Sequence, residues 1–209
     1  MTYLTQALID AGTASRLKLW AWDCYKWHKA VWEAFPGRRD KQREFLTRLD
    51  EKNGSYRLLI VSSEIPVRPN WCPPDGWQTK PIPEQYFQKS RYAFQLRANP
   101  TKKVAVQNPD GSFKKNSRRE PLRTRDELVA WIQRKAAQGG FAVDVEKLRI
   151  IQHGPQRFKK DGAAGTHTAV EFQGVLTVTD PKKFHETFTR GIGPAKAFGF
   201  GLLVIAPIT

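Results

Sequence analysis

Two side chains that can move protons, Tyr25 and His28, are three residues apart in a segment with helical spacing. Residues three apart lie on one face of a helix. An unperturbed histidine has a pKa of about 6.5, so its ring can act as an acid or as a base near neutrality. Lys26 and Lys29 add positive charge beside it. This set could transfer protons and stabilise developing negative charge, although a lone histidine on a helix more often has a structural role.

The charge of the whole chain indicates what this set would act on. The 209 residues include 35 Lys and Arg against 20 Asp and Glu, a formal net charge of +15. This excess favours a nucleic acid or an anionic membrane surface as partner. However, no apolar run approaches the roughly 18–20 residues that span a bilayer, and residues 1–10 do not resemble a signal peptide. We therefore expect a cytoplasmic protein that binds nucleic acid and no membrane.

The sequence offers no pattern that would hold a metal ion or other cofactor. Cys24 and Cys72 form no close pair, and the four histidines lack a CxxC or HxxxH partner. No suitable carboxylate cluster is present, which disfavours a metal-dependent nuclease. RNA needs no metal to be cut, because its own 2′-hydroxyl can attack the adjacent phosphate. The protein must align that attack, move two protons and stabilise the charge, and His28, Tyr25 and nearby cations could do so. Which residue is the acid and which the base stays open.

Three basic clusters predict an RNA-binding surface. A single basic residue is more often a solvated surface charge, but clusters neutralise phosphates. The clusters comprise Lys114, Lys115, Arg118, Arg119, Arg123 and Arg125; Arg157, Lys159 and Lys160; and Arg97, Lys102 and Lys103. The middle cluster lies in a loop expected over residues 153–167, whose low aromatic content favours recognition of a folded RNA by shape and phosphate contacts over single-strand stacking.

Four glycines near the C-terminus could bring backbone N–H groups close to a polyanion. Gly191 and Gly193 precede Lys196, Gly199 and Gly201 follow it, and an apolar segment comes next. Glycines at this density permit a close approach of the backbone to phosphate. The alternative is a tight turn before a buried terminal strand.

The elements that must position these residues follow one pattern twice. In the first half the expected elements are a strand over 3–9, a helix over 23–35, and strands over 43–51 and 55–65 joined at Asn53-Gly54. Six prolines within 66–88 predict an irregular connection. In the second half they are a strand over 91–98, a helix over 123–135, strands over 141–152 and 168–178, a helix over 181–190, and a strand over 202–208.

This order predicts an α+β fold with two tandem ferredoxin-like (RRM-like) βαββαβ domains. The N-terminal domain, residues 1–90, would carry the helix with His28. The C-terminal domain, residues 91–209, would carry the basic hairpin loop and the glycine-rich segment.

Several motifs occur in order along the chain. They are Tyr25-x-x-His28, Leu96-Arg-Ala-Asn-Pro-x-Lys102, Pro121 with Ala130-Trp131, Lys159-Lys-Asp-Gly162, Phe172-x-Gly174-x-Leu176, and the glycine-rich segment that starts at Gly191. Together, over essentially the whole chain, they resemble the CasE family, the repeat-processing endoribonucleases of the type I-E CRISPR Cascade system.

The resemblance implies two ferredoxin-like domains and metal-independent cleavage of the CRISPR repeat hairpin on the 3′ side of its stem, giving a 2′,3′-cyclic phosphate and a 5′-hydroxyl. His28 would be the principal catalytic residue and Tyr25 its helper. The expected RNA-binding residues are Lys29, Arg97, Lys102, Lys103, Arg157, Lys159, Lys160 and Lys196, with Gly191, Gly193, Gly199 and Gly201 packing beside the RNA.

The resemblance also implies partners. They are the repeat RNA, as precursor and as mature guide RNA, and the other Cascade subunits, with the free protein a monomer. Two rival functions remain at this point. One is a non-catalytic RRM-like RNA-binding protein in which His28 is structural, and the other is a scaffold subunit that holds a guide RNA for assembly only.

Overall fold

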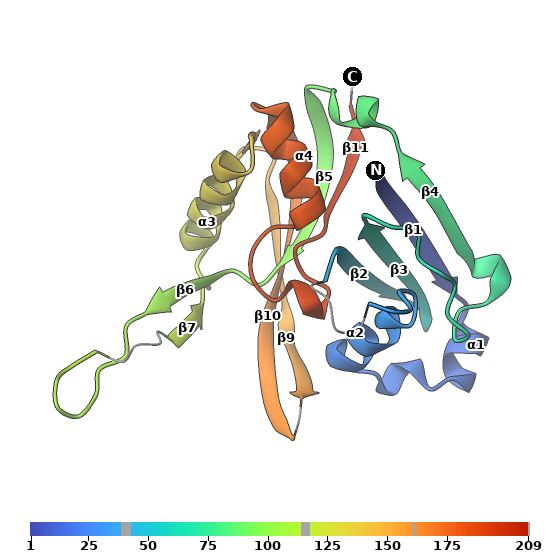
Figure 1. The fold of residues 1–209 in the computed structure, drawn as a ribbon. Helices are drawn as coiled ribbons and strands as arrows, with labels where there is room; N and C mark the ends of the chain where they lie inside the picture. Colours follow the sequence, from blue (N-terminus) through green and yellow to red (C-terminus); the bar gives the residue numbers. More distant parts are fainter. Residues whose placement is uncertain (39–42, 114–117, 161, 209) are drawn as a thin grey trace.

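The computed structural model of the chain describes residues 1–38, 43–113, 118–160 and 162–208. Two antiparallel sheets stand side by side, and a two-stranded arm projects from the second one (Figure 1). Lys114 and Lys115, expected to be part of a basic cluster, lie outside the described residues. The backbone of Lys160 belongs to a strand, but its side chain is outside the described part of the structure.

The first sheet has the strand order of a ferredoxin-like unit. Its strands are β1 (Thr2–Ile9), β2 (Phe45–Lys52), β3 (Ser55–Ser62) and β4 (Trp77–Ile82), in the order β2-β3-β1-β4. Asn53 and Gly54 both have positive φ, 52° and 74°, which gives the two-residue hairpin turn that suits the twist of the flanking strands. The hairpin expected at Asn53-Gly54 is therefore confirmed.

Three short helices cover one face of this sheet: α1 (Ala11–Arg16), the 3-10 turn η1 (Leu19–Ala21) and α2 (Cys24–Trp32). The side chain of Asp23 caps α2 by accepting from the backbone N–H groups of Tyr25 and Lys26. Alternation along β3 separates two cores, because successive side chains of a strand point to opposite faces. Leu58 and Ile60 pack under α2, whereas Leu59 and Val61 join the core of the second sheet.

The expectation of an irregular connection over 66–88 is wrong for its second half. Residues 77–82 form β4, which pairs with β1 at the edge of the sheet between the 3-10 turns η2 (Pro74–Gly76) and η3 (Glu84–Phe87). An edge strand tolerates Pro81 because its outer side needs no backbone donor. The described chain between β3 and β4 contains no α-helix, as its proline content predicts.

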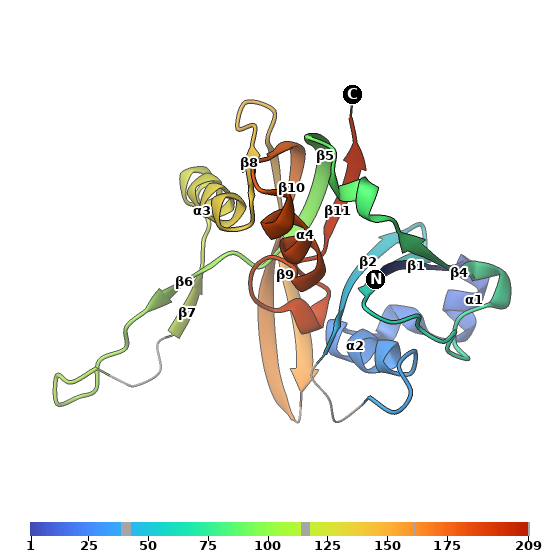
Figure 2. The same cartoon turned by 45° about the horizontal axis from the view of Figure 1, so that its top comes forward.

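The second sheet repeats the pattern. Its strands are β5 (Arg91–Ala98), β8 (Phe141–Val143), β9 (Arg149–Lys160), β10 (Ala163–Val178) and β11 (Leu203–Pro207). Their order is β11-β5-β10-β8, and β9 pairs with the other part of long β10, so β8 and β9 share the second position of a ferredoxin-like sheet. The helices α3 (Arg125–Gln138) and α4 (Pro181–Arg190) complete the βαββαβ order, with α4 on the side of the first sheet (Figure 2).

Residues 153–167 are not the loop that we expected. Residues 153–160 and 163–167 continue the β9–β10 ladder out to the pair Lys160–Ala163, with a register shift between Thr168 and Val170. The ring of Phe158 lies across Gly165, its partner in the ladder, where a Cβ would be 2.2 Å from the ring. The hairpin consequently extends well beyond β5 and β11 (Figures 1 and 2).

The arm is a second feature that the sequence did not predict. It consists of β6 (Thr101–Val104) and β7 (Arg118–Pro121), which pair only with each other. It leaves the second sheet directly after β5 and returns at the start of α3 (Figure 1). No described helix is long and apolar enough to cross a membrane.

Candidate functional site

His28 lines a cavity of about 250 Å³ at the junction of the two sheets. One wall comes from α2 and β2 of the first sheet. The other comes from β9 and from the 3-10 turn η4 (Lys196–Phe198) within the glycine-rich segment. Arg97, Gln156, Arg157 and Phe198 line the cavity together with His28. The site therefore combines a half-buried imidazole with two cations, and it needs both halves of the fold.

The helix α2 holds His28 in place through its own sequence. Asp23 fixes the first turn, and Trp27 anchors the buried face of the helix against Tyr56 and Trp71. The indole Nε1 of Trp32 donates to Nε2 of His28 at 3.2 Å, and the two rings meet edge to face. In this arrangement Nε2 is an acceptor, so the ring proton of a neutral His28 is on Nδ1.

Tyr25 lies one turn before His28 on the same side of α2, as their spacing predicts. Their ring centroids are 6.4 Å apart, and each is 6.4 Å from the ring of Phe198. The ammonium group of Lys29 is 5.0 Å from the centre of the Tyr25 ring, a cation–π contact that places positive charge beside this side chain. Phe198 thus forms the wall that faces both proposed proton-transfer groups.

The glycine-rich segment is a tight turn held by its own backbone. All four of its glycines at 191, 193, 199 and 201 have positive φ, as does Ala195. The N–H of Ile192 donates to the carbonyl of Gly201, and the N–H of Gly201 donates to the carbonyl of Arg97 on β5. A Cβ on Gly201 would be 2.6 Å from the carbonyl oxygen of Ile192. The turn geometry by itself therefore requires glycine here, and the predicted contact of this segment with RNA stays a prediction.

An aromatic cluster joins this turn to the β9–β10 hairpin. The His167 ring stacks on Phe158 at 4.7 Å and contacts Phe198 at 4.7 Å and Phe200 at 5.6 Å. Its Nδ1 is 3.1 Å from the amide nitrogen of the buried Asn99. Burial lowers the pKa of His167 below its usual value. The cluster was missed in the sequence, where Phe158 within a basic segment was its only visible sign.

The hairpin also contacts α2 directly, since the backbone N–H of Lys159 donates to Oδ2 of Asp23 at 3.0 Å. The exposed side chains of Arg157 and Lys159 lie on this hairpin. Of the two, Arg157 reaches the His28 cavity.

A buried ion network ties the sheets together behind the cavity. Glu171 on β10 pairs with Arg48 on β2 at 2.8 Å and with Arg97 on β5 at 3.4 Å. Arg48 and Arg97 also pair with Asp50, at 3.1 and 3.0 Å. Burial would raise the pKa of Asp50, but Arg48, Arg57 and Arg97 hold it below its usual value. Arg97, predicted to bind RNA, is therefore already engaged by two carboxylates.

The remaining predicted cations lie elsewhere. Lys102 pairs with Glu127 at 3.1 Å, and Lys196 donates to the carbonyl of Arg190 at 2.7 Å. Lys102, Lys103 and Lys196 line a different cavity, which does not include His28. Among the described residues, no group of three or more His, Cys, Asp or Glu side chains is arranged to hold a metal ion.

Comparison with known proteins gives concordant matches over nearly the whole chain. The family described as CRISPR associated protein matches residues 2–207. The CRISPR system Cascade subunit CasE of Escherichia coli is 35% identical over 195 residues, which cover 91% of this chain and 96% of that protein. The CRISPR-associated endoribonuclease Cse3 of Thermus thermophilus is 32% identical over 199 residues, covering 88% and 90%.

The fold is matched by a solved structure of the CRISPR endoribonuclease Cse3 bound to a 19-nucleotide RNA. It superposes with a TM-score of 0.73 at 28% identity and covers 99% of this chain and all of that one. The tandem ferredoxin-like arrangement expected from the sequence is confirmed by this match and by the strand order of both sheets.

Proposed function

This chain belongs to the family of CRISPR-associated proteins, and we propose that it is the endoribonuclease that processes CRISPR repeat RNA for a Cascade complex. Relatives named Cascade subunit CasE and endoribonuclease Cse3 each match about nine-tenths of the chain. The observation that carries the proposal is the cavity between the two ferredoxin-like units. It presents an imidazole and two guanidinium groups in a chain of net charge +15.

The proposed reaction is an internal transesterification of the RNA. The 2′-hydroxyl at the cut site attacks the adjacent phosphorus and the bond to the 5′-oxygen of the next nucleotide breaks. The products are a 2′,3′-cyclic phosphate and a 5′-hydroxyl, and no metal takes part. His28 is the principal proton-transfer group and Tyr25 its helper, while Arg157 supplies positive charge at the phosphate. Lys29 keeps the Tyr25 ring in a positive environment.

We place the stem of the repeat hairpin against the β9–β10 hairpin, with the cut on the 3′ side of the stem. Arg157, Lys159 and Lys160 would neutralise its phosphates, an interaction that weakens with rising salt. Arg97 could contact RNA only by sharing its guanidinium with Asp50 and Glu171. After cleavage the protein would keep the guide RNA and join the other Cascade subunits in the cytoplasm.

A second candidate is an RNA-binding or scaffold subunit without catalysis. The hydrogen bond from Trp32 to His28 favours it, because a histidine held in this way could simply stabilise α2.

Two substitutions separate these functions. We expect the purified protein to cut a CRISPR repeat hairpin in EDTA and leave a cyclic phosphate. H28A should keep binding but slow cleavage by about 100- to 10,000-fold, the usual contribution of a general acid or base. W32F removes the donor to His28 while keeping an aromatic ring, so it is the matched control. Cleavage by H28A at the wild-type rate would remove His28 from the active site. If H28A and W32F lose the same amount of cleavage activity, the role of His28 is structural. If the wild-type protein never cuts the hairpin, the scaffold function is supported.

A further inference from the structure

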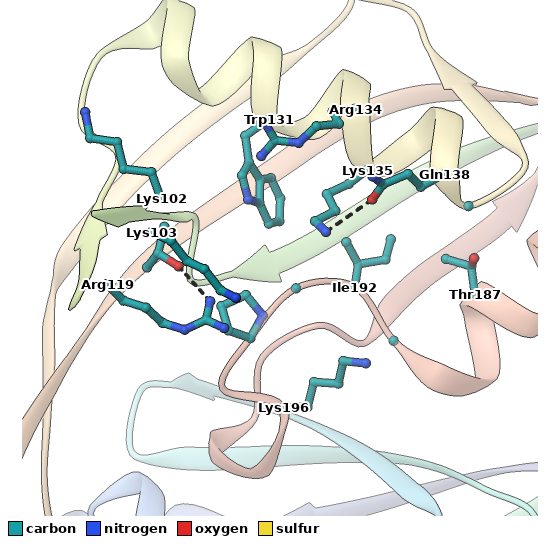
Figure 3. A pocket seen from close by; sticks show the side chains of 15 residues that line it. Lys102, Lys103, Arg119, Trp131, Arg134, Lys135, Gln138, Thr187, Ile192 and Lys196 are labelled. Carbon is teal, nitrogen blue, oxygen red and sulfur yellow. Dashed lines mark hydrogen bonds between the residues drawn. The ribbon is translucent and has the colours of Figure 1, made fainter. Parts of the chain in front are cut away.

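A strongly cationic cavity lies outside the His28 site. It has a volume of about 640 Å³ and opens between the β6–β7 arm, the end of α3 and the glycine-rich segment (Figure 3). Six cations from these three places line it, namely Lys102, Lys103, Arg119, Arg134, Lys135 and Lys196. All its lining residues belong to the described chain, and none of them is Asp or Glu. Only Lys102 has a carboxylate partner, Glu127, as judged from the ion pairs of the described residues.

A second cavity of about 590 Å³ adjoins the first and shares Lys196 in its lining. This neighbour lies between the start of β2 and the end of α4, and it adds Arg43 and Arg190 to the basic lining. Its single acidic side chain, Glu44, is 3.5 Å from Arg38. Lys196 lines both cavities, so we call the two together the cationic channel. Burial lowers the pKa of Lys196, and the charges of Arg43, Lys135 and Arg190 lower it further.

The channel and the His28 cavity share no lining residue but meet at one turn of the chain. Lys196 opens η4 on the channel side, and Ala197, Phe198 and Gly199 line the His28 cavity. Because Lys196 and Ala197 are consecutive, a chain bound at His28 needs only to pass η4 to enter the channel. The two sites are thus placed for successive parts of one polymer.

The chemistry of the channel suits one strand of nucleic acid. The β6–β7 arm, α3, α4 and the glycine-rich segment supply its lining, and together they place basic side chains around an open hollow. Its cations can neutralise consecutive phosphates, and the planar guanidinium groups of Arg119 and Arg134 can stack on unpaired bases. The half-buried Pro194, which also lines the first cavity, offers an apolar surface that suits the same bases.

We propose that the cationic channel binds single-stranded RNA that continues from the repeat stem, on a path that leaves the His28 cavity around η4. The inference rests on the proposed function, since the His28 cavity must hold the cut site. It adds Arg119, Arg134 and Lys135 to the RNA-binding surface, residues with no part in contacting the stem. The strand could be the 5′ or the 3′ flank of the hairpin, which have the same chemistry.

Three RNAs and two double variants test this assignment. The RNAs are a repeat hairpin made uncleavable by a 2′-deoxy substitution at the cut site, alone or with a single-stranded extension at its 5′ or its 3′ end. The test variant is R134A/K135A. The control is K89A/R91A, which removes one Lys and one Arg from exposed positions at the far end of the second sheet. Affinities are measured over a range of salt, and cleavage of an all-ribose hairpin without extensions is followed in parallel.

We expect one extension to tighten binding by the wild-type and control proteins, and R134A/K135A to lose that gain. Two lost phosphate contacts on a single strand lower the slope of log K against log salt by about 1.4. Between about 50 and 200 mM salt, the wild type would then lose about sevenfold more affinity for the extended RNA than the variant does. The extension that shows this difference identifies the bound flank. Binding and cleavage of the bare hairpin should stay unchanged.

Other results would overturn the inference. They are extensions that add no affinity to the wild type, equal losses in the test and control variants, or a loss by R134A/K135A that is as large on the bare hairpin. In each case, continued cleavage of the bare hairpin by the wild type would leave the proposed function intact. A wild-type protein that neither binds nor cuts that hairpin would overturn both.

Discussion

Replacing Glu171 with Gln should loosen the junction on which the His28 cavity depends. Glu171 is 2% exposed and its carboxylate pairs with Arg48, which is 5% exposed, and with Arg97. Its Oε2 makes no hydrogen bond among the described residues and faces Arg97 at 3.4 Å. The amide of Gln carries no charge, so E171Q leaves one buried guanidinium with Asp50 as its remaining partner.

The size of the effect follows from this burial. Breaking a buried pair by removing one partner typically costs about 3–5 kcal/mol. Because Asp50 still compensates Arg48, we expect the lower end, about 3 kcal/mol. For a chain of this length, 1 kcal/mol shifts Tm by about 2–4 °C, so E171Q should lower Tm by about 6–12 °C. Salt should change this shift little, since buried charges are poorly screened.

Thermal unfolding followed by circular dichroism measures the shift, with two controls. The surface change E64Q removes the exposed pair between Arg38 and Glu64 and should cost at most about 1 kcal/mol. The double variant R48M/E171L replaces the buried pair by apolar side chains and should recover most of the stability. At a temperature where every variant is folded, E171Q should also cut repeat RNA more slowly than R48M/E171L, because the cavity takes its walls from both sheets.

A Tm for E171Q within the range of E64Q would refute this reasoning, because the pair would then be hydrated or unimportant. The same holds if R48M/E171L is less stable than E171Q. A lower Tm for R48M/E171L than for E171Q would mean that the ion pair itself contributes net stability. The cost of E171Q would then not come from an unpaired charge left in the core.

Three further predictions concern the hairpin, the aromatic cluster and the glycine-rich segment. K159A/K160A should lower the slope of log K against log salt for a repeat stem by about 1.8, and an unchanged slope would deny these lysines a phosphate role. Burial lowers the pKa of His167, so the unfolded chain takes up its proton at higher pH than the folded chain does; stability should be full above the usual pKa of about 6.5 and fall as the pH drops below it. H167F should flatten this fall in Tm between about pH 8 and pH 5, and an equally steep fall would exclude His167 as its cause. G201A should lower Tm more than G111A, because both glycines have positive φ but only the first would bring its Cβ within 3 Å of a backbone carbonyl; equal shifts would contradict this.

Much of the fold could be predicted because local signals agreed with the final arrangement. Asn53-Gly54 required its hairpin, and Asp23 and Thr124 begin α2 and α3 through side-chain caps. Where prediction failed, a distant partner decided the outcome. β4 forms because β1 offers a free edge. Residues 153–160 and 163–167, expected to be a loop, pair as a ladder in which Gly165 leaves room for the ring of Phe158. Neither partner is visible from composition.

Only the part of the site that lies on one helix, α2, could be predicted from the sequence. Spacing alone puts Tyr25 and His28 on one side of α2, although their roles stay predictions. Phe198, about 170 residues later in the chain, could not be assigned to the same cavity from sequence. The predicted basic residues also divide into two groups, with Arg157 beside His28 and Lys196 in the cationic channel. Net charge predicts that a polyanion binds, but only tertiary structure separates the places where it can lie.

The glycine-rich segment determines how these two places are related. Its backbone bonds, from Ile192 to Gly201 and from Gly201 to Arg97, fix the turn η4 against the second sheet. Because η4 is fixed, Lys196 faces one cavity and Phe198 the other with a single residue between them. In an RNA that spans both sites, the turn η4 would therefore fix the distance between the cut position and the bound flank. The glycines are then required for the geometry of this turn. The turn would affect the RNA indirectly, because it holds the walls of the two sites at a fixed distance from each other.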